Sequence, residues 1–368
     1  MRITPASLIV LLSFIMGPMP VTGLHGEEVP SPQSPFSAPQ ELGDYVRRTV
    51  MRSSSLHSTL QAILSHTFMP VDQGGLGIVY DNGHTRTVKE VWADRRANCL
   101  SLTAFYVEAC TSIGLKARYA EALNTNRWAR RNGQVRLERH VVALVDGGAN
   151  GDLVADFLPQ ARRRMGVYAV DIIPPKRFLA LFYANRAVEV MENGDYAQVE
   201  SLCSRAINSD PKLSSAWNTR GVLRLHQARL VEAEQDFKVA IGLEKRDFIA
   251  LGNLENLYRL LGMEEESRKY RELSLKLRQR DPYFQAFLAE ESLLAGQHEE
   301  ALRQIKVAIK IQPKDPEFYL LRARIEMDKG DLEGATKSIR DAQKCASPED
   351  QSRFENKAES LKRLQEGR

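Results

Sequence analysis

Three residues of this chain could together carry out acyl transfer at a thiol: Cys99, His140 and Asp156. Apolar residues recur at helical spacing after Cys99, which predicts a helix that begins at this cysteine and ends before Gly114. A helix N-terminus and an adjacent imidazolium both favour the reactive thiolate form of a cysteine. We therefore expect Cys99 to be the nucleophile, His140 its base, and Asp156 the group that orients the imidazole.

Strands are expected to position the other two members of this triad. His140 precedes the apolar run 141–145, and Asp156 follows Leu153-Val-Ala. The glycine-rich run from Gly147 predicts a hairpin loop between these two segments. One hairpin would therefore hold both the imidazole and the carboxylate, next to a further strand expected over residues 117–123. The backbone N–H of Cys99 would meet part of the developing oxyanion.

Residues 42–159 resemble the transglutaminase-like superfamily of papain-like thiol enzymes. The resemblance rests on the cysteine at a helix start, a Gly-Leu-x-Ala-Arg exit from that helix, and the spacing to the histidine and the aspartate; residues 87–92 are similar to the short helix that precedes the nucleophile. The sequence departs from the commoner Gly-x-Cys pattern at Asn98-Cys99, and Val-Val follows the histidine where an aromatic residue is frequent. The resemblance implies an α+β papain-like/transglutaminase-like domain over residues 41–175.

Each triad residue also has a purely structural interpretation. A lone cysteine on an apolar helix usually packs as a small hydrophobic side chain, and a lone histidine on a strand is usually structural. The main alternative is a domain that keeps the shape of the triad without turnover. Four cysteines do not make a disulfide framework.

The second half of the chain has a period of 34 residues. Glycine recurs at this step and would end the first helix of each pair, with Ala228 once in its place. Small packing residues recur at the same step in two further series. The members are Gly194, Gly262, Gly296 and Gly330; Val199, Ala233, Ser267, Ala301 and Ala335; and Ala206, Ala240, Ser274, Ala308 and Ala342.

This pattern resembles five tetratricopeptide repeats over residues 176–347, an all-α solenoid, followed by a polar capping helix over 348–368. The third repeat is degenerate, because Arg271 stands where Phe237 and Ile305 stand in their repeats; the neighbouring Tyr270 is expected to fill the gap. Cys203 occupies the same packing position and is expected in the core. Because each repeat contacts mainly its neighbours, we expect the array from about residue 179 to fold alone.

Repeats of this family usually bind a protein or peptide on an inner surface made by the first helix of each pair. The polar candidates on that surface are Asn218, Asn256, Glu290 and Arg324. The sequence has no Lys/Asn arrangement that resembles the carboxylate clamp of chaperone-binding members of the family. Recognition of a C-terminal carboxylate through such a clamp is therefore not expected. The alternative is a scaffold that only orients the first domain.

The N-terminal residues predict export. Residues 1–23 contain Arg2, an apolar run over 8–16 and a small-residue exit, which is typical of a secretory signal peptide cleaved near Gly23. The apolar run is shorter than the roughly 20 residues of a membrane span. Residues 24–40 are expected to form a flexible linker. We expect the mature protein in the bacterial periplasm or secreted, without a membrane span.

Charge and motifs exclude several classes of function. The chain has 51 basic and 47 acidic residues, a net charge of +4, which does not favour a nucleic-acid partner. The basic run from Arg127 to Arg139 could recruit an anion, but a solvated loop is the favoured interpretation. The seven histidines lack ligand spacing, and no Walker loop or dinucleotide fingerprint is present. No metal and no cofactor are therefore expected.

The sequence thus predicts an exported thiol enzyme that attacks an amide or peptide carbonyl, with a repeat scaffold that binds a protein or peptide. Hydrolysis is favoured over transfer to an amine. The alternative is a catalytically inactive adaptor whose repeats mediate protein–protein interaction. A third interpretation, cleavage of peptide stems in the cell wall, has no glycan-binding module to support it.

Overall fold

The computed structural model of the chain describes residues 35–122, 127–131, 134–138, 140–148, 151–157 and 170–346. The expected signal peptide and capping helix, and most of the expected linker, lie outside these residues. The chain divides into two compact units. The first unit contains the described residues of Leu11–Thr125 and Arg139–Ala250, and the second contains those of Asn126–Glu138 and Leu251–Arg368.

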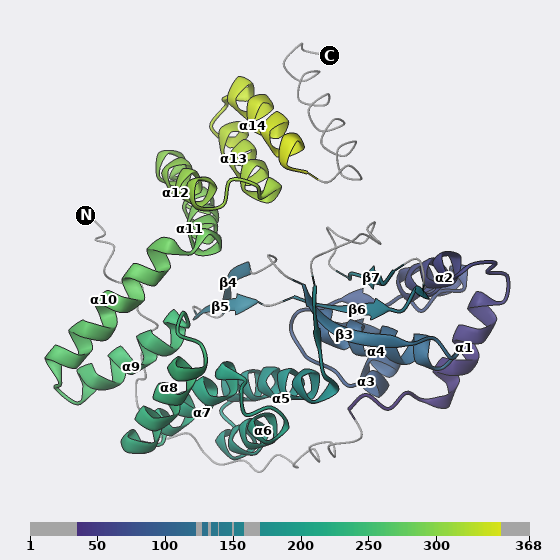
Figure 1. Cartoon of the computed structure of the whole chain (residues 1–368), viewed down its shortest axis with the longest axis horizontal. Helices are drawn as coiled ribbons and strands as arrows, with labels where there is room; N and C mark the ends of the chain where they lie inside the picture. Colours follow the sequence, from purple (N-terminus) through teal and green to yellow (C-terminus); the bar gives the residue numbers. More distant parts are fainter. Residues whose placement is uncertain are drawn as a thin grey trace. The chain divides into compact units, whose positions relative to one another are not determined.

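A four-stranded antiparallel sheet lies in the first unit, with the strand order β7-β6-β3-β8. Figure 1 labels β3, β6 and β7 of this sheet. The register places Ala143 opposite Ala155, which confirms the expected pairing of the two strands that flank the Gly147 run. All of β6 is buried, because its alternate side chains enter the main core on one face and a smaller apolar cluster on the other. The strands are β3 (Ala117–Ala122), β6 (Val141–Val145), β7 (Leu153–Ala155) and β8 (Val170–Ile173).

Helix α4 (Cys99–Thr111) is the central helix of this unit. It is buried on nearly every side, so its sequence is apolar all round instead of amphipathic. The hydroxyl of Tyr106 donates to the carbonyl of Leu60 at 2.9 Å and fixes α4 to α2. The remaining elements of this part are α1 (Gln40–Val50), α2 (Leu56–Phe68), η2 (Val71–Gln73), β1 (Val79–Tyr80), α3 (Val88–Asp94) and β2 (Arg96–Ala97). The unit therefore combines helices with an antiparallel sheet, whereas its placement in the papain-like class stays a prediction.

The first two helix pairs of the repeat also belong to the first unit. They are α5 (Pro175–Glu192) with α6 (Tyr196–Ser209) and α7 (Ser214–His226) with α8 (Leu230–Leu243). Phe178 of α5 stacks on Tyr119 of β3 with ring centroids 3.9 Å apart. Helix α5 begins at Pro175 and shares one hydrophobic core with α4 and the sheet. The domain boundary expected near residue 175 stays a prediction.

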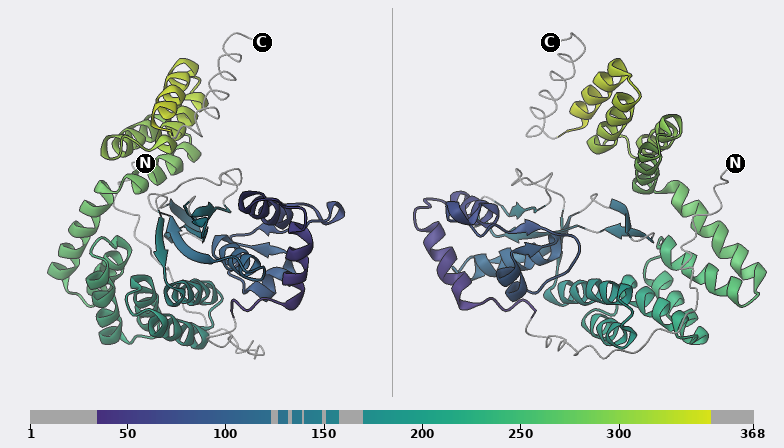
Figure 2. Two further views of the ribbon diagram at one scale, coloured as in Figure 1. Left: turned by 45° about the vertical axis from the view of Figure 1, so that its right-hand side comes forward. Right: turned by 180° about the vertical axis from the view of Figure 1, so that it is seen from behind.

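The later helix pairs form most of the second unit. Helix α9 (Phe248–Leu260) crosses the division between the units at Leu251. Tyr258 of α9 stacks on Tyr270 of α10, as expected for the degenerate third repeat. Figure 2 shows these helices from two further sides. The remaining helices are α10 (Glu264–Arg280), α11 (Pro282–Leu294), α12 (His298–Ile311), α13 (Pro316–Asp328) and α14 (Leu332–Cys345).

A β-hairpin from the middle of the chain also belongs to the second unit. Strands β4 (Arg127–Arg131) and β5 (Gln134–Glu138) are antiparallel neighbours, so these residues form a hairpin and not the loop expected for this basic run. Trp128 is only 4 % exposed and meets Phe284 of α11 edge to face at 5.6 Å. Charge patterning missed this hairpin because an aromatic anchor between basic residues decides its packing.

The repeat positions predicted from the 34-residue period behave as expected. The four repeating glycines all have positive φ, and Ala228 adopts φ 58° in their place. The small residues of the two packing series are buried where helices meet, as is Cys203. Within the part of the chain that the structure describes, every helix is too short or too polar to cross a membrane.

Candidate functional site

Cys99 is the first residue of α4, as the sequence predicts, and its side chain is partly buried. Asn98 caps the helix, and its Oδ1 accepts from the backbone N–H of Ser101 at 2.9 Å. This satisfies one of the free N–H groups of the first turn. The Cys99 thiol therefore lies at the positive end of a buried helix, where a negative charge is stabilised.

His140 and Asp156 meet at one end of the β6–β7 pair. His140 comes directly before β6, and Asp156 comes directly after β7, so antiparallel pairing brings them to the same end. Nε2 of His140 lies 2.7 Å from Oδ1 of Asp156, and both side chains are buried. The backbone carbonyl of His140 also accepts from the N–H of Ala122, which fixes it to β3.

The electrostatics of His140 favour its charged form. Burial alone would lower its pKa, but hydrogen bonds with Asp156 and Cys99, and the charges of these two groups, raise the pKa of His140 to about 9. Because Asp156 occupies Nε2, Nδ1 is the nitrogen left for the thiol. The structure thus brings all three predicted residues together, with the His140 ring between the Asp156 carboxyl group and the Cys99 sulfur.

Thr103 ties the helix to the strand that follows His140. Its hydroxyl lies 2.8 Å from the carbonyl oxygen of Cys99 and 3.2 Å from that of Val141. One side chain therefore spans the gap between the thiol-bearing turn and β6. Spacing alone could not identify Thr103, because a threonine on an apolar helix carries no signal of a tertiary contact.

The buried cysteines have a different environment. Cys110 and Cys203 are fully buried, and loss of hydration raises the pKa of each thiol to about 12. Burial also raises the pKa of the partly exposed Cys345. No histidine contributes to the pKa of any of these three thiols. The predicted core role of Cys203 agrees with its burial.

The four candidate partner-binding residues all lie on first helices of their pairs. Asn256 accepts from Arg259 of α9 at 2.7 Å, and Arg324 of α13 is exposed. Asn218 of α7 lies in the first unit, whereas the other three, including Glu290 of α11, lie in the second. Asn256, Glu290 and Arg324 therefore belong to one unit, and Asn218 belongs to the other.

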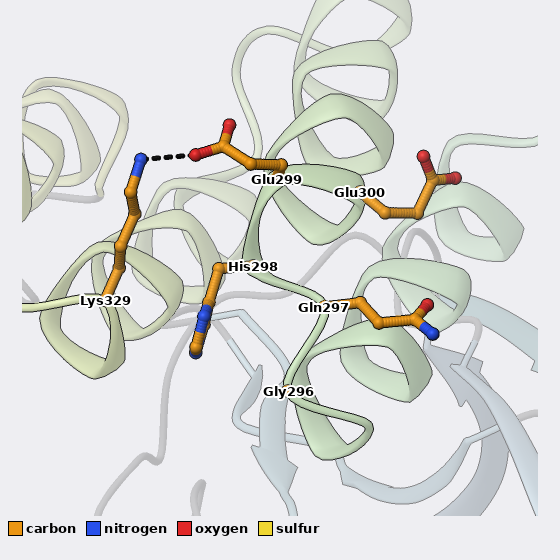
Figure 3. A pocket seen from close by; sticks show the side chains of 6 residues that line it. All are labelled: Gly296, Gln297, His298, Glu299, Glu300 and Lys329. Atoms are coloured by element: carbon orange, nitrogen blue, oxygen red, sulfur yellow. Dashed lines mark hydrogen bonds and ion pairs between the residues drawn. The ribbon is translucent and has the colours of Figure 1, made fainter.

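An open pocket of about 460 Å³ lies elsewhere on the second unit (Figure 3). It lies where α12 begins and α13 ends, and no triad residue lines it. Its charged groups are already paired, since His298 contacts Asp328 at 2.8 Å and Lys329 contacts Glu299. The lining residues are Gly296, Gln297, His298, Glu299, Glu300 and Lys329. This pairing makes the pocket a weak candidate for a ligand site.

A metal site does not emerge from the described residues, where no three His, Cys, Asp or Glu side chains gather to hold an ion. The side chains of the basic hairpin and Arg139 lie outside the described residues, so their expected roles stay predictions.

Comparisons with known proteins bear on the helical part alone. No family model matches the chain, and no curated protein does. Solved helical-repeat structures match about half of it. YrrB, described as a TPR protein with an unusual peptide-binding site, is 16% identical over 48% of this chain and 92% of its own, with a TM-score of 0.26.

Two further matches are similar in extent. TTC0263, a TPR protein of Thermus thermophilus, is 18% identical over 50% of this chain and 98% of its own length, with a TM-score of 0.27. Yeast Tom70 is 15% identical over 51% of this chain and 47% of its own length, also with a TM-score of 0.27. Likenesses this weak say nothing of function. The repeat assignment rests on the helix pairs and their 34-residue period, and the resemblance of residues 42–159 to transglutaminase-like enzymes stays a prediction.

Proposed function

We propose that this protein is a repeat scaffold that binds a protein or peptide partner. The observation that supports the proposal is the series of helix pairs with small buried residues and positive-φ caps at a constant step of 34 residues. Such arrays present an extended surface built from their first helices. In the second unit that surface includes Asn256, Glu290 and Arg324. We further propose that the protein is exported, on the strength of residues 1–23.

Selection of displayed peptides on the immobilised full chain tests this proposal. Replacing Asn256, Glu290 and Arg324 together by alanine should abolish the enrichment of peptides that the wild type selects. A matched variant with Arg268→Ala, Lys306→Ala and Arg340→Ala changes exposed residues on the second helices and should keep it. Equal losses in the two variants, or no enrichment with the wild type, would contradict the proposed binding surface.

A second function, acyl transfer at Cys99, is favoured by the triad geometry. The sulfur of Cys99 would attack a carboxamide or peptide carbonyl carbon, and the N–H of Cys99 would donate to the oxyanion. Collapse of this intermediate would break the C–N bond, give a thioester, and send the proton of His140 to the leaving amine. Asp156 would keep the imidazole oriented throughout.

Resolution of the thioester would return the site to its starting state. His140, now neutral, would take a proton from a water molecule while the oxygen of that water attacks the thioester carbon. Cleavage of the C–S bond would then release the acid and restore the Cys99 thiolate beside the imidazolium. An amine would enter in the same way and give a new amide. We favour water as the acceptor because the sequence resembles exported superfamily members, which look mostly hydrolytic or unassigned.

Trapping with hydroxylamine separates the enzyme from an inactive adaptor. Hydroxylamine intercepts a thioester as a hydroxamate whichever natural acceptor is used. Full-length protein incubated with a mixture of peptides rich in carboxamides should form hydroxamates, and Cys99→Ala should not. If wild type and Cys99→Ala give the same background while the repeats still select peptides, the adaptor function stands alone.

A further inference from the structure

The last turns of α5, the first repeat helix, are bonded to the loop that precedes α3. Oε1 of Glu189 accepts from the backbone N–H of Thr85 at 2.8 Å, and Oε2 of Glu189 lies 3.1 Å from Nδ1 of His84. The Glu189 side chain is 17% exposed, so these contacts are largely sheltered from water. A carboxylate on a repeat helix therefore fixes a loop that lies more than 100 residues earlier in the chain.

Arg186, one turn earlier on α5, determines the tautomer of His84. Its Nη1 contacts Nε2 of His84 and donates to the carbonyl of Thr85 at 3.1 Å. A guanidinium has no acceptor, so Nε2 must accept and the proton of the neutral ring must sit on Nδ1. Nδ1 of His84 then faces Oε2 of Glu189, 3.1 Å away. Two side chains of α5 therefore hold the backbone of Thr85: Glu189 accepts from its N–H, and Arg186 donates to its carbonyl oxygen.

The same loop holds the first turn of α4. Thr85 is fully buried, and its Oγ1 accepts from Nδ2 of Asn98 at 2.8 Å. Next along the loop, the backbone N–H of Arg86 donates to Oγ of Ser101 at 2.7 Å. The residues on each side of Cys99 are therefore bonded to the loop that Glu189 fixes.

We propose that Glu189 is a positioning residue for Cys99. The inference rests on the proposed thiol function and deepens it. Glu189 acts through the Thr85 peptide, Thr85 acts through the amide of Asn98, and Asn98 caps the turn that carries the thiol. The first repeat is thereby part of the support of the thiol site. Loss of Glu189 would leave the buried N–H of Thr85 without its acceptor, and the loop would have to move to find another.

The test measures the second-order rate constant for alkylation of Cys99 by iodoacetamide between pH 5 and 9 in the full-length protein. Four variants are compared: Glu189→Ala, Glu189→Gln, Thr85→Val and Glu192→Ala. Glutamine keeps an acceptor for the Thr85 N–H, and valine removes only the acceptor for Asn98. Glu192 is an exposed carboxylate on the same helix and serves as the matched control. Labelling of the buried Cys110 and Cys203 reports unfolding in every sample.

Glu189→Ala should slow the labelling of Cys99 at neutral pH by about tenfold, because a misplacement of ~1 Å can cost as much as 10²-fold in a preorganised site. Glu189→Gln should restore most of the rate, Thr85→Val should slow it, and Glu192→Ala should leave the pH profile unchanged. If Glu189→Ala exposes Cys110 and Cys203, the Thr85→Val profile decides.

Two results would overturn the inference, and they differ. Wild-type rates in both Glu189→Ala and Thr85→Val, with a reactive wild-type Cys99, would remove the positioning role and leave the proposed thiol function intact. A wild-type Cys99 that reacts no faster than an ordinary exposed thiol would overturn the thiol function and the positioning role together.

Discussion

The two compact units build their hydrophobic cores in different ways. In the first unit a single core joins α1 to α4, the sheet and the repeat helices α5 to α7. In the second unit smaller clusters lie between neighbouring helices, one within α11 to α13 and another within α13 and α14. The same 34-residue pattern thus contributes to a globular core at one end and forms a linear array at the other, where each repeat depends on its neighbours.

The largest stability effect is expected where the repeat enters the globular core. Phe178 is fully buried and stacks on Tyr119. Phe178→Ala should lower the free energy of unfolding of the first unit by about 3–5 kcal/mol. Hydrogen exchange should then accelerate together in α4, β3 and α5, because one core holds them. Acceleration confined to α5 would show that the shared core is not cooperative.

A matched core substitution in the second unit should act locally. Ile305 of α12 is fully buried. Ile305→Ala should cost about 2–5 kcal/mol, at the lower end if the helices collapse around the gap. Exchange should accelerate in α11, α12 and α13, whereas α4 keeps its wild-type protection. Loss of protection in α4 would contradict the division between a globular core and a linear array.

The charged state of His140 links the triad to the stability of the first unit. Its folded pKa of about 9 lies above the ordinary value of 6.5, and this difference corresponds to roughly 3 kcal/mol. Because the folded pKa is raised, the contribution is complete below about pH 6.5 and disappears as pH rises through about 9.

Asp156→Asn removes the largest of the interactions that raise this pKa, so the pKa of His140 should fall below its wild-type value. The stability difference between wild type and Asp156→Asn should be greatest on the acid side of pH 6.5 and should shrink toward pH 9. NMR titration of the His140 ring and denaturation at several pH values measure both effects. A wild-type His140 that titrates at its ordinary value would refute the electrostatic account.

The smallest effect is expected at the one repeat that lacks its glycine. Ala228 has φ 58°, whereas the equivalent positions hold glycine with positive φ. An alanine in this region is strained by roughly 1–2 kcal/mol. Ala228→Gly should therefore stabilise the α7–α8 pair by up to about 1 kcal/mol once the greater freedom of glycine in the unfolded chain is included. A lower melting temperature for Ala228→Gly would contradict this reading of the cap.

Local signals predicted the parts of the site that depend on short segments. The start of α4 at Cys99, the strand over 141–145 and the return to Asp156 follow from periodicity and turn residues, and the pairing of the two strands brings His140 and Asp156 together. The positive-φ positions of the repeat follow from its glycines. In each case neighbouring residues carry the whole signal, so tertiary contacts had little to add.

Features that depend on distant contacts could not be predicted in this way. The burial of Trp128 against Phe284 turns a basic run into a hairpin, and the bond from Glu189 to Thr85 joins segments far apart in the chain. Residues of α5 to α7 also share the first core, a contact that the repeat period does not indicate. Independent folding of the array from residue 179 stays a prediction. Such pairings are set by the assembled core and leave no periodic trace.

Competitive alkylation of the full-length protein tests directly whether His140 and Asp156 activate Cys99. With limiting iodoacetamide at pH 6–7, mass spectrometry should find Cys99 modified well ahead of Cys110, Cys203 and Cys345, and Asp156→Asn should remove most of this advantage. Labelling of Cys99 at the same rate as Cys345, or more slowly, would contradict this activation and leave the repeats as the functional part of the molecule.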